Sequence, residues 1–382
     1  MTRTMVRAVP ISILAALIGA CICVACTGIM LQGDDGTVVA ARTEEWGAFD
    51  FNSQLIYVPA GSTVTCMSPC DPCPGMTYVT QYRVIGIVPE RKEDFYVSVA
   101  DGMNECGLTI GSFYLPGFAG FEPFDSSRRD RTMGAGDLPL FLLSQCATVD
   151  EVCRLLTQDP PRFFIAPVAI DEFGGPLPLH YRVIDATGEA IVVEYINGGE
   201  VHIHQPVLGV ITNSPTYDWH LTNLRTYIEL QTVNREGIEI DGHLYTPLGG
   251  GSGMLGLPGD NTPPSRFVQA VAYTWTARPT LGGLDTVNEA FRILDHFNFA
   301  TYGSEGSKPV TQEVPLPSAT QWTSAADTKR RIYYYHTAWN RRLRMIDMKR
   351  IDPRITVITF MPLDPVPRMQ DIEEVHIPVP EG

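Results

Sequence analysis

The alternation of apolar and polar residues along this chain predicts β-strands more often than helices. Segments 27–32 (TGIMLQ) and 37–42 (TVVAAR) have strand composition, and the turn-forming run 33–36 (GDDG) joins them, so they predict a hairpin. The run 95–117 predicts two strands around a tight turn at Asp101-Gly102. Further strands are expected at 55–61, 82–89, 180–186, 190–198, 201–213, 321–327, 331–339, 342–348 and 355–361.

Helical periodicity is confined to four segments, at 137–157, 218–231, 264–277 and 284–297. In the first of them Thr148 and Glu151 have the spacing of a capping box, which predicts a helix start there. No repeat and no hydrophilic linker divides the chain. Two strand-rich blocks interleaved with helices indicate stacked sheets covered by helices, because each sheet must bury its apolar face. We therefore expect one α+β domain over residues 26–382.

Residues 1–25 have the three parts of a secretory signal peptide. Arg3 and Arg7 form a charged start, an apolar run extends from Ile11 to Val24, and small residues precede a cleavage point after Ala25. The apolar run is short for a permanent membrane helix. We therefore expect an exported protein, periplasmic or secreted, whose mature chain begins at Cys26.

Composition describes an ordinary globular protein. The chain has 382 residues, of which 44% are hydrophobic and 19% are charged. Its formal net charge is −15, and loss of Arg3 and Arg7 with the signal segment would make it −17. Nucleic-acid binding needs a basic surface, so this acidity argues against a nucleic-acid partner.

The nine cysteines become seven after cleavage, at positions 26, 66, 70, 73, 106, 146 and 153. Six of them could form disulfides in an oxidising compartment, leaving Cys26 as a free thiol. The group Cys66, Cys70 and Cys73 is open to a second interpretation as a metal site, but no histidine follows at ligand spacing. We expect no metal, and the pairing of the cysteines cannot be read from the sequence.

A cysteine at the mature N-terminus offers a thiol and a free α-amine on one residue. The amine can serve as the base for its own side chain, which is the principle of N-terminal nucleophile hydrolases. An alternative is lipid attachment at Cys26 or at Cys21, and an acylated amine on Cys26 could not act as a base. Membrane anchoring is expected only in that case. It would leave either a non-catalytic binding protein or an enzyme anchored through Cys21.

Six motifs together decide between these hypotheses. They are CTGIML (26–31), AARTEEWG (40–47), DGMNECGL (101–108), GVITNSPTYDWHLTNL (209–224), GMLGLPGDNTPPSRF (253–267) and RRIYYYHTAWNRRLRMIDM (330–348). The chain thereby resembles the choloylglycine hydrolase family, which includes bile salt hydrolases and penicillin V acylases, from Cys26 to about Met361.

The resemblance implies a four-layer αββα fold and hydrolysis of a linear amide bond in a small molecule, without a cofactor. We expect a hydrolase that resembles penicillin V acylases, with hydrolysis of conjugated bile salts or of N-acyl homoserine lactones as alternatives. Family members are often homotetramers, and segment 214–250 resembles their assembly loop, so a homo-oligomer is expected.

The resemblance also implies roles for residues near the N-terminus. Cys26 matches the nucleophile, and Arg42 matches an arginine beside the thiol, where a fixed cation favours thiolate. Glu45 falls where the family usually has an aspartate that holds the N-terminal amine. The extra methylene is a departure from the family pattern, and the neighbouring Glu44 is an alternative for that role.

Three later residues complete the implied site. Asn213 matches an asparagine that donates to the oxyanion of the tetrahedral intermediate. Arg266 matches a second arginine near the thiol. Tyr114 stands where bile salt hydrolases usually have asparagine, and in this respect the chain resembles penicillin V acylases. Its backbone N–H could complete the oxyanion hole while its ring lines the acyl pocket.

Overall fold

The predicted N-terminal hairpin forms one edge of a five-stranded sheet in the computed structural model. The structure describes residues 24–47, 50–70, 73–90, 98–170, 173, 175–205, 207–300, 319–366 and 369–370. The hairpin strands, β1 (Val24–Gln32) and β2 (Val38–Trp46), pair antiparallel. The sheet continues in the order β1-β2-β18-β19-β20 with β18 (Ala319–Asp327), β19 (Ile332–Thr337) and β20 (Arg344–Asp347). Strands from the N-terminal and C-terminal parts of the chain, β2 and β18, are thus direct neighbours. The predicted signal segment lies outside the described residues, except for Val24 and Ala25.

A second sheet of eight strands has the order β15-β14-β13-β8-β7-β6-β3-β21. Its strands are β3 (Gln54–Val58), β6 (Val84–Val88), β7 (Asp101–Asn104), β8 (Thr109–Tyr114), β13 (Leu179–Ile184), β14 (Ala190–Ile196), β15 (Glu200–His204) and β21 (Thr359–Pro362). Short two-stranded ladders join β4 (Thr63–Thr65) to β5 (Thr77–Val79), β9 (Thr132–Gly134) to β10 (Phe164–Ala166), and β11 (Ala169–Ile170) to β12 (Gly175–Pro176). All pairs within the large sheet are antiparallel.

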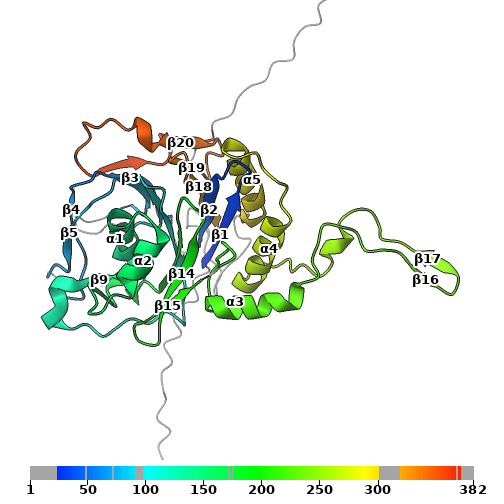
Figure 1. Ribbon diagram of the computed structural model, residues 1–382, viewed down its shortest axis with the longest axis horizontal. Helices are drawn as coiled ribbons and strands as arrows, with labels where there is room; N and C mark the ends of the chain where they lie inside the picture. The colour runs from blue at the N-terminus through cyan, green and yellow to red at the C-terminus, as the bar shows by residue number, and fades with distance from the viewer. Residues whose placement is uncertain are drawn as a thin grey trace, which may run out of the picture.

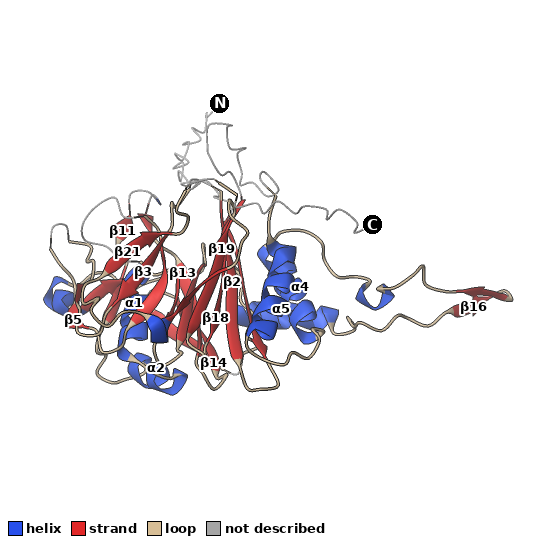
Figure 2. Cartoon of the chain, turned by 90° about the horizontal axis from the view of Figure 1, so that it is seen from above, coloured by secondary structure: helices blue, strands red, loops and turns tan. Residues whose placement is uncertain are grey.

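Helices cover the outer face of each sheet, which confirms the expected four layers (Figures 1 and 2). The helices α1 (Leu138–Gln145) and α2 (Val149–Leu156) bury apolar side chains against the eight-stranded sheet. On the far side, α4 (Pro263–Trp275) and α5 (Leu284–Leu294) pack on the five-stranded sheet, with α3 (Tyr217–Leu224) beside α4. Among the described residues, no helix combines the length and apolar character needed to cross a bilayer.

The inner faces of the two sheets pack directly on one another. Successive strand residues point to opposite faces, so every second residue of β1 and β2 faces the eight-stranded sheet. Gly28 is one of these, and its backbone also pairs with Ile211 from the segment after β15. A Cβ at Gly28 would lie 2.7 Å from Phe113 Cζ and 2.8 Å from Arg182 Nη1. The absence of a side chain at residue 28 therefore lets the sheets approach beside Cys26.

Two local predictions need correction. Asp101 and Gly102 are not a turn but lie within β7, where a Cβ on Gly102 would come within 2.9 Å of the Ile85 carbonyl oxygen. The turn falls three residues later and ends at Gly107, whose positive φ of 87° suits glycine. Strand 201–213 is also shorter than expected, because β15 ends at His204.

The Thr148 cap is confirmed in part. Its side chain accepts the N–H of Glu151 at 3.2 Å, so α2 begins where the sequence indicated. The Glu151 carboxylate does not return to the Thr148 N–H as a capping box would, but accepts the N–H of Ala147 at 2.7 Å. The segment of helical periodicity at 137–157 forms two helices that are separated at Cys146.

An extended arm leaves the body after α3 and returns before α4 (Figures 1 and 2). Its tip is a hairpin of β16 (Ile238–Ile240) and β17 (His243–Tyr245), every residue of which is exposed. The arm replaces the second half of the helix that the sequence predicted at 218–231. Its backbone groups pair mainly within the arm itself.

Gly28→Ala should lower the free energy of unfolding by about 1–3 kcal/mol, the usual cost of adding a methyl group to a filled interior. Chemical denaturation of both proteins measures the difference. Gly175→Ala is the matched control, because a Cβ there meets no atom within 4 Å. Equal stability of the Gly28 variant and the parent would contradict close packing of the sheets at this point.

Candidate active site

The Cys26 thiol lies between the two sheets, opposite a carboxylate. Cys26 pairs directly with Glu44 across the β1–β2 ladder, and opposed residues on antiparallel strands share a face. Its Sγ donates to Oε1 of Glu44 at 3.7 Å. Arg42, two residues before Glu44, projects from the same face. The exposed fractions of Cys26, Glu44 and Arg42 are 2%, 7% and 0%, so all three groups are shielded from water.

The Arg42 guanidinium is fixed on several sides. Its Nη1 donates to the carbonyl oxygens of Ala100 at 2.8 Å and Ser112 at 2.5 Å, both from the eight-stranded sheet side. Its Nε donates to the Thr43 carbonyl at 3.2 Å, and its Nη2 forms an ion pair with Glu44 Oε2. Arg42 thus lies on the strand face of the thiol and has a carboxylate partner of its own.

Charges near the sulfur act in opposite directions. Burial raises the pKa of the Cys26 thiol well above its usual range, and the Glu44 carboxylate raises it further. Arg42 lowers the thiol pKa, as we expected of a fixed cation, but its effect is smaller than that of burial and of Glu44. Burial likewise raises the pKa of Glu44 against the opposing effect of Arg42. With Ala25 still attached to Cys26, the thiol is therefore neutral at physiological pH.

Glu45 lies on the other face of β2. Its Oε1 accepts the Thr320 hydroxyl at 3.0 Å, while its buried Oε2 has no hydrogen-bond partner within the described part of the chain. Burial raises the pKa of Glu45 to about 8 despite the nearby Arg266. Glu45 pairs with Ala25, next to the Cys26 nitrogen. That nitrogen is a peptide N–H here, so the predicted role of Glu45 in holding a free amine stays a prediction.

The Asn213 side chain connects three predicted site residues. Its Oδ1 accepts the backbone N–H of Cys26 at 2.7 Å and Nη2 of Arg266 at 2.8 Å. Its Nδ2 donates to the Tyr114 carbonyl at 2.9 Å. The Nε2 atom of His220 is hydrogen-bonded to the Asn213 carbonyl oxygen at 2.8 Å, and this contact fixes the loop that carries the Asn213 side chain. An amide nitrogen has two hydrogens, so one is left for a substrate oxyanion.

Arg266 lies in the first turn of α4 and is fully buried. Its Nη1 donates to the Cys26 carbonyl at 2.6 Å and to the Thr27 hydroxyl at 2.8 Å, and its Nε donates to the Asn261 carbonyl at 3.0 Å. Arg266 thus binds the backbone of Cys26 and the side chain of Thr27, next to the nucleophile. Within this structure Arg266 holds β1 and Asn213 in their mutual position.

Four aromatic rings gather at the end of β2, next to these polar groups. The Trp46 ring is 5.5 Å from that of Tyr114, 5.0 Å from that of Phe51 and 5.1 Å from that of Phe173, measured between ring centres. Trp46 follows Glu44 by two residues, so it projects from the same face as the thiol. We call Trp46, Phe51, Tyr114 and Phe173 the aromatic cluster.

The sequence analysis did not place most of the residues around the thiol and the aromatic cluster. Arg42, Glu44 and Trp46 alternate along one predicted strand, and this period-two pattern could have placed Glu44 and Trp46 beside the thiol. No sequence signal identifies Phe51 or Phe173, because only the tertiary fold brings them to Trp46. Tyr114 contacts Asn213 through its carbonyl, and the role predicted for its N–H stays a prediction.

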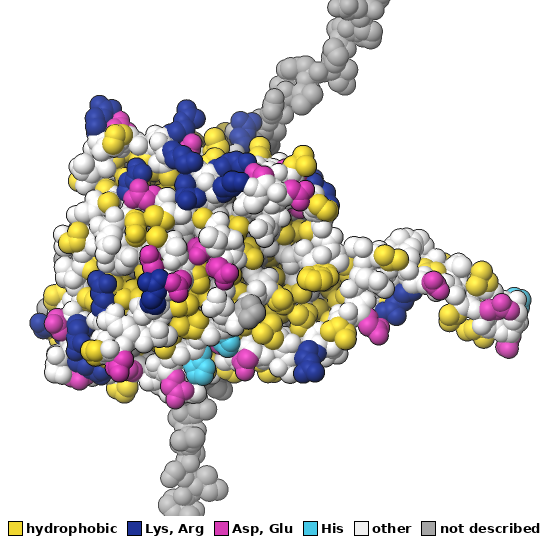
Figure 3. Space-filling view, in the orientation of Figure 1, with side chains coloured by type: hydrophobic (Ala, Val, Ile, Leu, Met, Phe, Trp, Pro, Cys, Tyr) yellow, Lys and Arg dark blue, Asp and Glu magenta, His cyan; other side chains and the backbone are white. Residues whose placement is uncertain are grey.

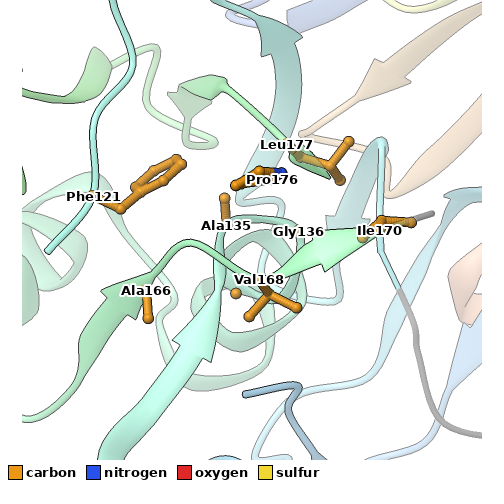
Figure 4. A pocket seen from close by; sticks show the side chains of 9 residues that line it. Phe121, Ala135, Gly136, Ala166, Val168, Ile170, Pro176 and Leu177 are labelled. Carbon is orange, nitrogen blue, oxygen red and sulfur yellow. The ribbon is translucent and has the colours of Figure 1, made fainter. Parts of the chain in front are cut away.

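A small apolar hollow lies between the β9–β10 and β11–β12 ladders (Figure 4). Phe121, Val168, Ile170 and Leu177 are among the side chains that line it, and none of the predicted catalytic residues does. The part of the chain that the structure describes contains no group of three or more His, Cys, Asp or Glu side chains placed to hold a metal ion.

Comparison with known proteins identifies the family. Residues 26–353 match the model of the linear amide C–N hydrolases, choloylglycine hydrolase family, so the chain belongs to that family and the match begins at Cys26. A bile salt hydrolase/transferase of Clostridium perfringens is 30% identical over 327 residues, which cover 85% of this chain and 93% of the relative. A penicillin V acylase of Pectobacterium atrosepticum is 26% identical over 262 residues, 67% of this chain and 63% of that protein.

The fold agrees with this assignment. A crystal structure of a variant conjugated bile acid hydrolase from Clostridium perfringens superimposes with a TM-score of 0.76 at 27% identity and covers 92% of this chain and 100% of the other. The protein is therefore a linear amide hydrolase with the N-terminal nucleophile hydrolase fold, and an N-terminal cysteine nucleophile is a feature of its family. The structure brings Cys26, Arg42, Glu45, Asn213, Arg266 and Tyr114 together at one end of β1 and β2.

Asn213→Ala should reduce kcat by about 10²–10³-fold, because removal of one oxyanion donor typically has this effect. The variant also loses the acceptor of the Cys26 N–H and of Arg266. Steady-state kinetics on an amide substrate, with circular dichroism to verify folding, make the measurement. A folded variant with the parental kcat would exclude Asn213 from oxyanion stabilisation.

Proposed function

We propose that this hydrolase prefers amides with a flat aromatic acyl group, as in the phenoxyacetyl side chain of penicillin V. The aromatic cluster carries this proposal. Two of its members are tied to the catalytic groups, since Trp46 shares a strand face with the thiol and Tyr114 binds the Asn213 amide through its carbonyl. An acyl group held by Cys26 and Asn213 would meet these rings first.

The geometry of the cluster suits an aromatic guest. Trp46 meets Tyr114 and Phe173 edge-on, at interplanar angles of 88° and 66°, which is a favoured arrangement for aromatic rings. A further ring can join such a cluster by the same edge-to-face contacts. A conjugated bile salt has a rigid steroid in this place, which offers neither a π-face nor a ring edge.

The reaction starts from the mature N-terminus. The Cys26 α-amine takes the thiol proton, directly or through a water, and an amine with an unperturbed pKa of about 7.7–8.0 is suited to this task near neutrality. The sulfur attacks the amide carbonyl, Asn213 stabilises the oxyanion, and the ammonium protonates the leaving nitrogen. Water then hydrolyses the thioester. Glu45 is well placed for the amine, because cleavage removes its partner Ala25 and its Oε2 has a vacant acceptor position among the described residues.

Export and disulfide formation belong to the same proposal. The segment before Cys26 acts as a signal peptide, and an unlipidated Cys26 is required for the amine to work. No disulfide joins any two of the seven described cysteines. Of these, Cys70 and Cys73 have their sulfur atoms 2.6 Å apart, which favours them as one disulfide pair. Exchange with an external disulfide would form the bond, and the two thiol hydrogens would pass to that partner.

The arm supports the proposed homo-oligomer. Its exposed apolar side chains include Ile228, Val233, Ile238, Leu244 and Leu248. Figure 3 shows hydrophobic side chains along the projecting arm. Apolar side chains gathered on a projecting segment typically mark a protein interface. A second copy of the chain is the partner that we propose for it.

The substrate proposal predicts a higher kcat/KM on penicillin V than on taurine- or glycine-conjugated bile salts. Because one pocket contact supplies only about 1–3 kcal/mol of discrimination, the two kcat/KM values should differ by about 10–200-fold and not more. Tyr114→Asn should narrow this ratio. Parallel assays of both substrates with both proteins test it. A parental preference for the bile salt conjugates would refute an aromatic acyl pocket and leave amide hydrolysis itself unaffected.

The amine proposal predicts the effect of a single added residue. A chain that begins with Ala25-Cys26 keeps the thiol but lacks the free amine on Cys26, and its activity should fall by about 10²–10⁴-fold, the usual contribution of acid–base catalysis. Intact mass must first establish that the parent begins at an unmodified Cys26. Cys26→Ala sets the background rate. Full activity of the extended chain would show that another base operates.

A further inference from the structure

Glu44 is a buried carboxylate whose position the amide hydrolase mechanism above does not use. Its exposed fraction is 7%, and it lies across the ladder from the nucleophile. One carboxylate oxygen accepts the Cys26 thiol at 3.7 Å and the other is paired with Arg42. Taking a carboxylate out of water is costly unless its partners compensate. Both partners of Glu44 belong to the active site.

A role limited to neutralising Arg42 does not account for this arrangement. Arg42 already donates to the carbonyls of Ala100, Ser112 and Thr43, and only one of the two Glu44 oxygens is needed for the ion pair. The other oxygen is directed at the sulfur. Glu45 cannot take its place, because adjacent strand residues project from opposite faces and Glu45 bonds Thr320 on the helix side.

We propose that Glu44 is a further active-site residue of this hydrolase, which accepts the hydrogen bond of the Cys26 thiol and keeps the sulfur protonated until the substrate reacts. The inference rests on the proposed function only in taking Cys26 as the nucleophile. Glu44 would orient the S–H bond and, by cancelling the charge of Arg42, prevent the resting thiol from ionising.

The charges around the sulfur support this role. Arg42 faces Glu44 from β2, Cys26 faces it from β1, and Asp101 acts on it from β7. Glu45 adds a weaker negative field at the sulfur. One carboxylate, that of Glu44, and the Arg42 guanidinium thus lie on the face of the thiol, and a thiolate there would be a like charge next to Glu44. Burial and Glu44 accordingly both raise the thiol pKa.

The reaction remains balanced with Glu44 as a holding group. During attack the S–H bond breaks and the S–C bond forms, the carbonyl π-pair moves to oxygen, and the proton passes to the Cys26 amine. Collapse of the intermediate breaks the C–N bond and the amine returns that proton to the leaving nitrogen. Glu44 stays a carboxylate throughout. Its function is to make ionisation of the sulfur depend on the substrate and the amine.

The test is the pH dependence of Cys26 alkylation by iodoacetamide, followed by mass spectrometry of the peptide that contains Cys26. The chain that begins with Ala25 is used, because it has no free amine on Cys26 and no substrate is needed. We expect a midpoint above about 8.5, the value for an ordinary cysteine. Glu44→Gln should lower the midpoint by about one pH unit or more, which makes alkylation at pH 7 about tenfold faster.

Two matched variants define the effect. Glu45→Gln removes the neighbouring carboxylate on the other face and should shift the midpoint less. Glu239→Gln, on the exposed tip of the arm, should not shift it. A larger shift with Glu45→Gln than with Glu44→Gln, or a parental midpoint at or below 8.5, would overturn the proposal. If Glu44→Gln fails to fold, Glu44→Asp replaces it in the test. The shorter side chain places the carboxylate farther from the sulfur, so the alkylation midpoint should again fall, but by less than the fall expected for Glu44→Gln.

Hydrolysis gives a second readout on the mature enzyme. The acid limb of the kcat/KM profile should move to lower pH in Glu44→Gln, whereas mere structural damage lowers the rate equally at all pH values. An unchanged profile would reject Glu44 even if hydrolysis depends fully on Cys26. Absence of hydrolysis in the parent would instead reject the proposed function, while the alkylation midpoints would still decide the role of Glu44.

Discussion

The arrangement of this site depends on the ion pair and hydrogen bonds of the buried Arg42 guanidinium. The guanidinium lies between the sheets, and its central carbon is 4.4 Å from the ring centre of Phe113 and 5.1 Å from that of Trp322. Because it is buried, its charge must be compensated within the protein. Carbonyl oxygens next to β7 and in β8 supply hydrogen bonds, and Glu44 supplies the opposite charge. Removal of one member of a buried ion pair typically costs about 3–5 kcal/mol. The same contacts that join the sheets therefore also determine the electrostatic field at the nucleophile.

A second arginine extends this polar layer between the sheets. Arg182 of β13 donates to the carbonyls of Ile29, Gly209 and Ala41, which ties the N-terminal hairpin to the eight-stranded sheet. Burial lowers its pKa to about 10, with Asp101 opposing that shift. Elsewhere the two sheets meet through an apolar cluster that includes Leu55, Tyr57, Met103, Trp322 and Tyr333. The inter-sheet space thus has a charged region beside the nucleophile and an apolar region that provides ordinary packing.

Much of this architecture could be predicted from the sequence, but the register of the hairpin could not. The period-two pattern predicted the main strands, and the motifs gave the family and six site residues. A turn limited to residues 33–36 would have paired Cys26 with Thr43, whereas the observed ladder begins at Val38 and pairs Cys26 with Glu44. A shift of one residue exchanges the faces of a strand. Because of the single residue Thr37, the turn signal alone places Glu44 and Trp46 on the face away from the thiol. Only their alternation with Arg42, which the resemblance placed beside the thiol, indicates the observed face. Phe51 and Phe173 lie outside the strands, where periodicity gives no signal.

The adjacent glutamates of β2 project toward two different parts of the site. Strand alternation directs Glu44 to the sulfur between the sheets and Glu45 to the helix side, near the position that cleavage would convert into an amine. Val24 and Ala25 continue the ladder opposite Trp46 and Glu45, so cleavage before Cys26 would remove only the last two of the nine residue pairs of the hairpin. Cys26 then remains anchored by its pairing with Glu44 and by Arg266 on its carbonyl. A nucleophile at a strand end can in this way acquire a free amine without losing the contacts that position its thiol.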